Sequence, residues 1–488
     1  MLRATFQRLP NSIGCLKELK KIVIKGGNVR SLPEEFCLLQ LLEHLELLSC
    51  GMLSSLPSKF GDLTNLRYLD LSRCMNLRRL PVSFKNLMLL QHLNLQMCRE
   101  LILMSDDFQN ITKLEFLRLS ECKQLEELPS HITNQASLRE LYLDGVVSLN
   151  ELPIKIGQLS KLRKVKIRSE LLISLPNSLG YLSSLTDLLI EDCSNLESLP
   201  TSLGDLFSLT DLRIQNCPKL KCLPFSVGRL NLLEHLNISW CPISQVDFGV
   251  ASSSFALSNL KWMKLEETEL CKISISEDRY PLLKTLQFLS NYHLVEIEAL
   301  PASVECLYIR ECPKLEELPS FARLTSFRKF VVRGCNRIEK IEGLKYCTRL
   351  EILRLHTCWE VPGIESLQQM EKLRRLELKA NKGSAIDSCI QRVQKWPDGV
   401  IICTRAFSDA SSVVDSLLLS PNLILVDSFS RRDFYSVPEL LQKHSYNGNT
   451  IMLCYIINCV SVRQMEIYLE QSNVGISPMM EIEEGRWA

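Results

Sequence analysis

Residues 66–87 read LRYLDLSRCMNLRRLPVSFKNL, and this stretch decides the fold because it recurs along most of the chain. Leu69 and Leu71 are two positions apart, so a strand would point both to one face and turn Tyr68 and Asp70 to the other. The later leucines and the Leu-Pro step would carry the chain around to the next strand. One such unit buries too little surface to be stable alone, so we expect stacked units that share one core.

The pattern L-x-x-L-x-L begins sixteen times at nearly constant spacing. The steps are 23 or 24 residues, except one of 27 (Leu233 to Leu260) and one of 21 (Leu283 to Val304). This regularity predicts an α/β solenoid over residues 1–382, a horseshoe with a parallel sheet on its concave side. The starts are Leu19, Leu42, Leu66, Leu90, Leu114, Leu138, Leu162, Leu185, Leu209, Leu233, Leu260, Leu283, Val304, Phe327, Leu350 and Leu373.

The composition argues against several classes of protein. The 488 residues include 57 basic and 56 acidic ones, and the net charge of +1 is not that of a generally basic nucleic-acid-binding protein. The N-terminus lacks the apolar run of a secretory signal, and the longest apolar stretch, residues 451–460, is about half of what spans a bilayer. We therefore expect a cytoplasmic or nuclear protein with no membrane or nucleic-acid partner.

The cysteines and histidines do not indicate a metal site. The twenty cysteines contain no CxxC pair, and His44 and His92 would lie two strands apart, about 10 Å, too far for one zinc ion. We expect the cysteine that recurs after the strand in ten repeats to pack as a ladder of reduced thiols. Without an HExxH, GxSxG or phosphate-loop motif, the sequence predicts a binding protein that is not an enzyme and holds no cofactor. The ladder cysteines are Cys50, Cys74, Cys98, Cys122, Cys193, Cys217, Cys241, Cys312, Cys335 and Cys358.

The repeat pattern stops after Asn381, and we expect a small α/β domain over residues 383–488 that reads as incomplete. Asp427 would lie at a strand end, where ligands often bind, and Asp409 at a helix start, where a capping role is more common. A weak enzymatic activity in this segment is therefore an alternative to binding alone. Short β-type runs at residues 400–403, 423–426 and 451–457 alternate with helical stretches at 408–419, 437–444 and 462–471.

The pattern is that of the leucine-rich repeat, and its turns refine the type. Residues 185–206 combine the strand leucines, the cysteine and a LPxSLGxL turn. The chain over residues 1–382 thereby resembles the C-terminal repeats of plant intracellular nucleotide-binding leucine-rich-repeat (NLR, disease-resistance) receptors, and also the plant Ras-group repeat proteins. The first resemblance implies recognition of pathogen-derived or guarded host proteins through the concave face, as a sensor or regulatory module in innate immunity. The second implies a constitutive cytosolic signalling scaffold.

One departure from the receptor pattern limits what the resemblance implies. The chain contains no GxxxxGK[ST] phosphate loop, so it lacks the nucleotide-binding module of these receptors, and nucleotide-dependent switching is not implied for it. It also begins inside a repeat, at Leu9-Pro10, without a capping helix. We expect either a longer natural protein or a truncated gene.

The last four repeats would present many cations on the concave face. Six of their twelve outward residues are Arg or Lys and one is acidic. Like charges stacked at strand spacing repel each other, so we expect a counter-charge from an acidic surface of a protein partner, or from the chain's own C-terminal segment. The alternative is that the long side chains splay into water. The candidates are Arg310, Lys329, Arg333, Arg354, His356, Arg375 and Lys379, of which Arg310, Arg333, His356 and Lys379 would form one column.

A second candidate surface lies in the N-terminal half. Tyr68, His92 and Phe116 would occupy one outward column on successive strands, beside Arg118 and Tyr142. Exposed aromatic residues clustered with arginine are typical of protein-binding hot spots. Cross-strand packing of the rings is the alternative.

Between these surfaces, one basic strand would lie between two acidic ones. We expect Lys164 to lie between Glu140 and Asp187. We likewise expect Arg168 to lie between Asp144 and Glu191, which gives a structural network of cross-strand ion pairs.

Overall fold

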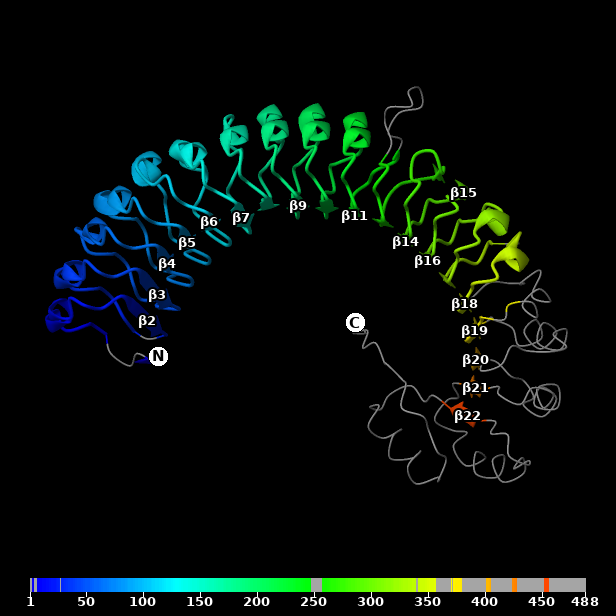
Figure 1. The fold of residues 1–488 in the computed structure, drawn as a ribbon, viewed down its shortest axis with the longest axis horizontal. Coiled ribbons are helices and arrows are strands. Elements are labelled where there is room, and N and C mark those ends of the chain that lie inside the picture. The colour runs from blue at the N-terminus through cyan, green and yellow to red at the C-terminus, as the bar shows by residue number, and fades with distance from the viewer. Residues whose placement is uncertain are drawn as a thin grey trace.

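The computed structural model describes residues 2–3, 7–26, 28–246, 257–338, 341–356, 370, 372–379, 401–404, 424–427 and 452–455. Within these residues the chain forms a curved solenoid, with strands along the inner side and short helices along the outer side (Figure 1). The predicted horseshoe is confirmed. No helix in the described part of the chain has the length and apolar composition needed to cross a bilayer.

One parallel sheet of 20 strands lines the concave side of the described solenoid. Each strand pairs in parallel with the next, and sixteen of them match the sixteen predicted repeats. The strands are β1 (Leu2–Arg3), β2 (Lys21–Lys25), β3 (His44–Leu48), β4 (Tyr68–Asp70), β5 (His92–Asn94), β6 (Phe116–Arg118), β7 (Glu140–Asp144), β8 (Lys164–Arg168), β9 (Asp187–Glu191), β10 (Asp211–Gln215), β11 (His235–Ser239), β12 (Trp262–Glu266), β14 (Thr285–Leu289), β16 (Cys306–Arg310), β17 (Lys329–Arg333), β18 (Ile352–His356), β19 (Arg375–Lys379), β20 (Ile401–Thr404), β21 (Ile424–Asp427) and β22 (Met452–Tyr455).

Most of the outer side is built from 3-10 helices, because a Leu-Pro step starts a tight turn in most repeats. Pro81 has φ −68° and ψ 151°, and the Phe84 amide then donates to the Pro81 carbonyl at 2.8 Å. Among the described residues these 3-10 turns take the place of the α-helices of an α/β solenoid. They are η1 (Asn11–Cys15), η2 (Glu34–Leu38), η3 (Phe60–Asp62), η4 (Val82–Asn86), η5 (Ser105–Phe108), η6 (Ser130–Asn134), η7 (Ile156–Gln158), η8 (Asn177–Tyr181), η9 (Thr201–Asp205), η10 (Phe225–Arg229), η11 (Phe321–Arg323) and η12 (Leu344–Tyr346).

A single hydrophobic core runs between the sheet and the 3-10 turns. The inward leucines of the repeats are buried, as are Leu69 in β4 and Leu71 directly after it. Four phenylalanines, Phe36, Phe60, Phe84 and Phe108, are fully buried at the same position of consecutive turns. The repeats therefore supply apolar side chains from equivalent positions to one continuous core, as the sequence pattern predicts.

The cysteine after the strand is also part of this core. The thiols of Cys74, Cys98 and Cys122 each lie 3.2 Å from a main-chain carbonyl of the preceding repeat, to which they donate. The ladder cysteines that the structure describes are all buried, as the predicted packing requires, and their reduced state stays a prediction. Cys358 lies outside the described residues.

A second, small sheet takes the place of the 3-10 turns, among the described residues, in the regular step from Leu260 to Leu283 and in the 21-residue step from Leu283 to Val304. Strand β13 (Lys272–Ser274) pairs in parallel with β15 (Glu296–Ala299), with a register shift between Ile273 and Ser274. Residues 247–256, within the 27-residue step, lie outside the described residues.

The three short strands predicted near the C-terminus are present as β20, β21 and β22. Each pairs in parallel with its predecessor, beginning with β19, so all three extend the concave sheet. The predicted helices between them lie outside the described residues. The division into domains at residue 382 stays a prediction.

Candidate functional site

Each five-residue strand points three side chains into the hollow of the horseshoe and two into the core. The register is in step from strand to strand, so outward side chains at equivalent positions form columns that cross the sheet. Three regions of this concave surface carry the candidate residues: strands β3–β7, strands β8–β12 and strands β16–β19.

Four aromatic rings on β3–β6 form one stack. His44, Tyr68, His92 and Phe116 follow one another with ring centroids 4.1 Å apart and interplanar angles of 6–8°. Tyr142 extends the group at 5.4 Å from Phe116, tilted by 44°. We call these five residues the ring stack. The predicted column of Tyr68, His92 and Phe116 is present, and the rings contact each other face to face.

Polar side chains in the adjacent column hold the ring stack in place. The His44 Nε2 and Glu46 Oε1 atoms are 2.6 Å apart. Burial opposes ionisation of Glu46, but the hydrogen bond and charge of His44 outweigh it and hold the pKa of Glu46 below its usual value.

The adjacent carboxyl, that of Asp70, is buried. Asp70 accepts hydrogen bonds from the Ser72 amide at 2.8 Å and from the Asn94 side chain at 2.9 Å. Because the Asp70 side chain accepts the hydrogen bond of the Ser72 amide, that amide is not free to continue the strand. Strand β4 therefore ends after three residues, and the loop that follows is held in place.

Tyr142 lies between two cations at one end of the ring stack. The Arg118 guanidinium carbon is 4.6 Å from the centroid of the Tyr142 ring, and the Lys164 Nζ is 5.8 Å from it. The Tyr142 hydroxyl donates to Glu140 Oε2 at 2.7 Å. Burial, together with this acceptor, raises the pKa of Tyr142 to about 12.

The ion pairs of the middle strands differ from the predicted ones. Lys166, rather than Lys164 or Arg168, lies between two carboxylates, 3.8 Å from Asp144 and 3.3 Å from Glu191. Arg168 instead pairs with Asp192 at 2.7 Å. The ladder between β8 and β9 ends one residue before Arg168, and Asp192 follows in a left-handed turn with φ 49°.

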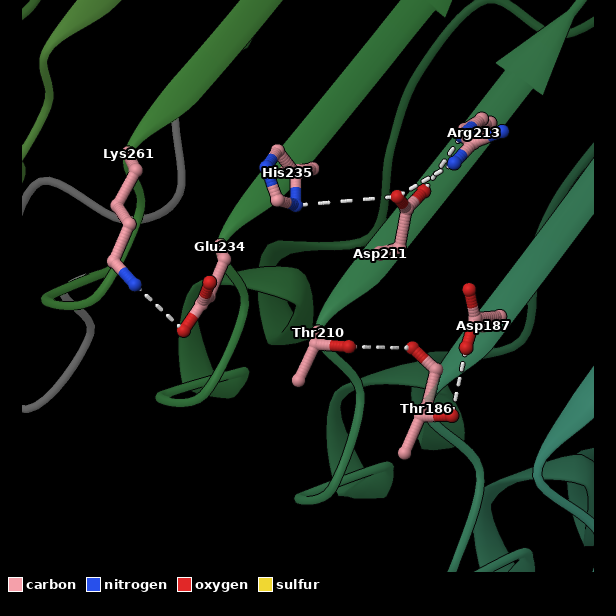
Figure 2. A network of polar contacts seen from close by, with 8 residues as sticks. All are labelled: Thr186, Asp187, Thr210, Asp211, Arg213, Glu234, His235 and Lys261. Atoms are coloured by element: carbon pink, nitrogen blue, oxygen red, sulfur yellow. Dashed lines mark hydrogen bonds and ion pairs between the residues drawn. The ribbon is translucent and has the colours of Figure 1, made fainter.

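A further polar network covers β9–β12 (Figure 2). Arg213 donates to both oxygens of Asp211, at 2.8 and 2.7 Å, and His235 Nδ1 is 3.9 Å from the same carboxylate. The Thr186 hydroxyl lies within hydrogen-bond distance of the Arg163 carbonyl and the Asp187 carboxylate, and the Thr210 hydroxyl donates to the Thr186 carbonyl. Most charges on these strands are thus paired within the protein, which favours a structural role for this region.

The basic column of β16–β19 has the predicted register. In the strand register Arg310 lies next to Arg333, Arg333 next to His356, and His356 next to Lys379. Part of the expected counter-charge comes from within the chain, because Glu311 Oε1 lies 3.7 Å from Arg333 Nε.

Of the other predicted residues here, Lys329 extends over the ring of Tyr308, at 5.1 Å from its centroid. Arg354 lies beside Val331 and Glu377 in register. Arg375 heads β19, next to Ile352. All seven basic candidates therefore share one end of the concave sheet, well separated from the ring stack.

Two residues of the N-terminal surface were not among the predicted binding residues. His44 continues the column of Tyr68, and its position follows from the same 24-residue step. The sequence predicted an ion pair for Lys164. Its register neighbour Glu140 lies two residues before Tyr142 on β7. For both His44 and Lys164, the position in the column of outward side chains was the signal that could have placed them at this surface.

Comparisons with known proteins agree with this fold. The model of the Leucine Rich Repeat family matches residues 65–87. No curated protein sequence matches the chain. A leucine-rich-repeat protein of Leptospira interrogans has a similar structure, with 20% identity, a TM-score of 0.53, and coverage of 86% of this chain and 93% of that one.

A second similar structure is that of the Toll–Spätzle complex of Drosophila, with 17% identity and a TM-score of 0.61. It covers 86% of this chain and 56% of that one. These likenesses concern the fold, as does the match of the repeat family. Sequence period, strand register and structural neighbours together identify this chain as a leucine-rich-repeat solenoid.

Proposed function

We propose that this chain recognises another protein through its concave face, with the ring stack of β3–β7 as the centre of contact. The observation that carries the proposal is the face-to-face packing of four half-buried rings at 4.1 Å spacing. Rings held in this way lose little conformational entropy on binding, and aromatic residues dominate the energetics of protein interfaces. The Toll–Spätzle complex is one case of a solenoid of this fold bound to a protein.

The basic column of β16–β19 supports a second contact with an acidic surface of the partner. Arg310 and Arg333 are exposed and adjacent in register, and mutual repulsion of such cations is relieved when an anionic surface covers them. This contact would add specificity and speed association more than it adds affinity.

The resemblance of the repeats to those of plant NLR receptors supports a role as a sensor or regulatory module in innate immunity, in the cytoplasm or nucleus. A constitutive signalling scaffold is the alternative. The two roles differ in output: substitutions in the ring stack of a sensor change the defence response, whereas those in a scaffold disrupt a signalling complex that is assembled without a pathogen.

Affinity capture with matched variants tests the proposal. We expect tagged wild-type chain to retain a partner from extracts of its own cells, and the double variant Tyr68→Ala/Phe116→Ala to lose it. Tyr181→Ala is the control, because Tyr181 is 72% exposed on the convex side. Retention by the concave variant, or loss by the convex control, would contradict the proposal. Arg333→Glu with Arg354→Glu tests the acidic contact in the same way, and unchanged capture would exclude it.

A further inference from the structure

Arg118 differs from most other concave cations because it has no carboxylate partner. Lys166, Arg168 and Arg213 each lie within 4.0 Å of a carboxylate. Within the described residues Arg118 makes no ion pair and no hydrogen bond, and its Nε atom is buried without an acceptor. The guanidinium of this partly buried arginine therefore has no acceptor within the described residues, and its donors are available to an anion.

Lys164 is the second cation of this kind, and it lies on the other side of Tyr142. Its Nζ atom is 5.8 Å from the Tyr142 ring, and no carboxylate of the described residues lies within 4.0 Å of it. Strand β7, which carries Tyr142, pairs with β6 on one side and β8 on the other. The two cations therefore flank one aromatic ring from neighbouring strands.

One acidic side chain, that of Glu140, lies beside Tyr142 and Lys164. It is next to Lys164 in register, and its Oε2 atom accepts the hydrogen bond of the Tyr142 hydroxyl at 2.7 Å. This hydrogen bond orients the Tyr142 ring between the cations. Arg118 and Lys164 carry two positive charges and Glu140 one negative charge, so the surface around Tyr142 keeps a net positive charge that attracts an anion.

We propose that Arg118, Tyr142 and Lys164 form an anion-recognition site that takes a carboxylate side chain of the partner, flanked by an aromatic or large aliphatic residue. The guanidinium of an arginine stacked on a ring keeps its fork of donors for a carboxylate. The flanking apolar residue of the partner contacts Phe116, whose ring lies 5.4 Å from that of Tyr142. The site rests on the proposed function, and it names the chemistry of the peptide segment that the ring stack recognises.

Selection of peptides on the intact chain tests this site. A phage library of random dodecamer peptides is panned on the immobilised full chain, and enriched peptides are measured individually by fluorescence anisotropy. We expect an Asp or Glu within two positions of Trp, Tyr, Phe or Leu. Arg118→Gln and Lys164→Gln each weaken these peptides at least about tenfold. Arg118→Lys restores part of the affinity, since it keeps the charge and loses the fork.

The control is Arg139→Gln, because Arg139 is an exposed arginine that already pairs with a carboxylate, that of Glu115 at 3.3 Å. Thermal unfolding establishes that each variant is folded. Enriched peptides without acidic residues, an affinity unchanged in both Gln variants, or no enrichment at all would overturn the proposed site.

Failure of this site and failure of the concave-face function give different results. Peptides that lose affinity in Tyr68→Ala/Phe116→Ala but not in Arg118→Gln would leave the function in place and reject the anion site. Peptides that are insensitive to all of these variants would reject both.

Discussion

The ring of Tyr68 lies 4.1 Å from the ring of His92, with 8° between the two planes. His92 has Phe116 at the same distance on its other side. An imidazole packed between two rings is shielded from water on both faces. A positive charge on His92 would therefore lie between two aromatic rings, so we expect the stability of the stack to depend on the protonation state of His92.

The first prediction concerns pH. Burial lowers the pKa of His92, and this outweighs the opposing charges of Asp70 and Glu140; His44 and Arg118 also favour the neutral form. The unfolded chain, with an ordinary histidine pKa near 6.5, then binds more protons than the folded chain as the pH falls below that value. We expect the free energy of unfolding to decrease from pH 7 toward pH 5.

The measurement is urea unfolding across this pH range for the wild type and His92→Gln. The variant should show a smaller decrease, since its side chain does not titrate. An identical pH dependence in both proteins would show that His92 does not carry the effect.

The second prediction concerns the close contact between outer turns. A Cβ atom at Gly180 would lie 2.3 Å from the main-chain oxygen of Ser202 in the next repeat, and backbone cannot yield as a side chain does. Gly180→Ala should lower the free energy of unfolding by about 1–3 kcal/mol. Gly51→Ala is the control, because nothing lies within 4 Å of a Cβ there. Equal stability of the two variants in chemical denaturation would refute the contact.

The third prediction concerns thiol reactivity. Burial raises the pKa of Cys122 to about 12 and that of Cys98 well above its usual value, so neither forms the reactive thiolate at neutral pH. Cys15, Cys222 and Cys271 are exposed. Brief treatment with iodoacetamide followed by peptide mass spectrometry should label these three and spare the buried pair. Early labelling of Cys98 or Cys122 in the native protein would argue against the packed ladder.

The fourth prediction concerns the phenylalanine core. Phe84 is fully buried, with Phe60 and Phe108 at the equivalent position of the turns on either side. Phe84→Ala should lower the free energy of unfolding by about 3–5 kcal/mol through lost burial and the cavity left behind. Val82→Ala, at a neighbouring position that is 84% exposed, should change it little. Similar losses for both variants would contradict the burial pattern.

The sequence alone predicts the sheet and its columns because the repeat step is nearly constant. Tyr68, His92 and Phe116 lie in one column since each follows the start of its repeat by two residues. The register of Arg310 and Arg333 follows in the same way. That these residues bind a partner stays a prediction.

The side-chain contacts could not be predicted, because register fixes Cβ positions and leaves long side chains a choice of partners. For this reason Lys166 forms the ion pairs with Asp144 and Glu191 that were predicted for Arg168, and Arg168 pairs with Asp192. Arg118 likewise has no carboxylate partner among the described residues, while the neighbouring Glu140 accepts the hydrogen bond of the Tyr142 hydroxyl. Such alternatives differ by rotamer, which the repeat pattern does not encode.

The most direct test of the central claim is site-specific photocrosslinking in the protein's own cells. A benzoylphenylalanine residue replaces Phe116 in the ring stack in one variant, and Tyr181 on the convex side in another. If the concave face binds the partner, irradiation yields a discrete crosslinked protein from position 116 and none from position 181. A crosslink that forms at position 181 and not at position 116 would contradict the account.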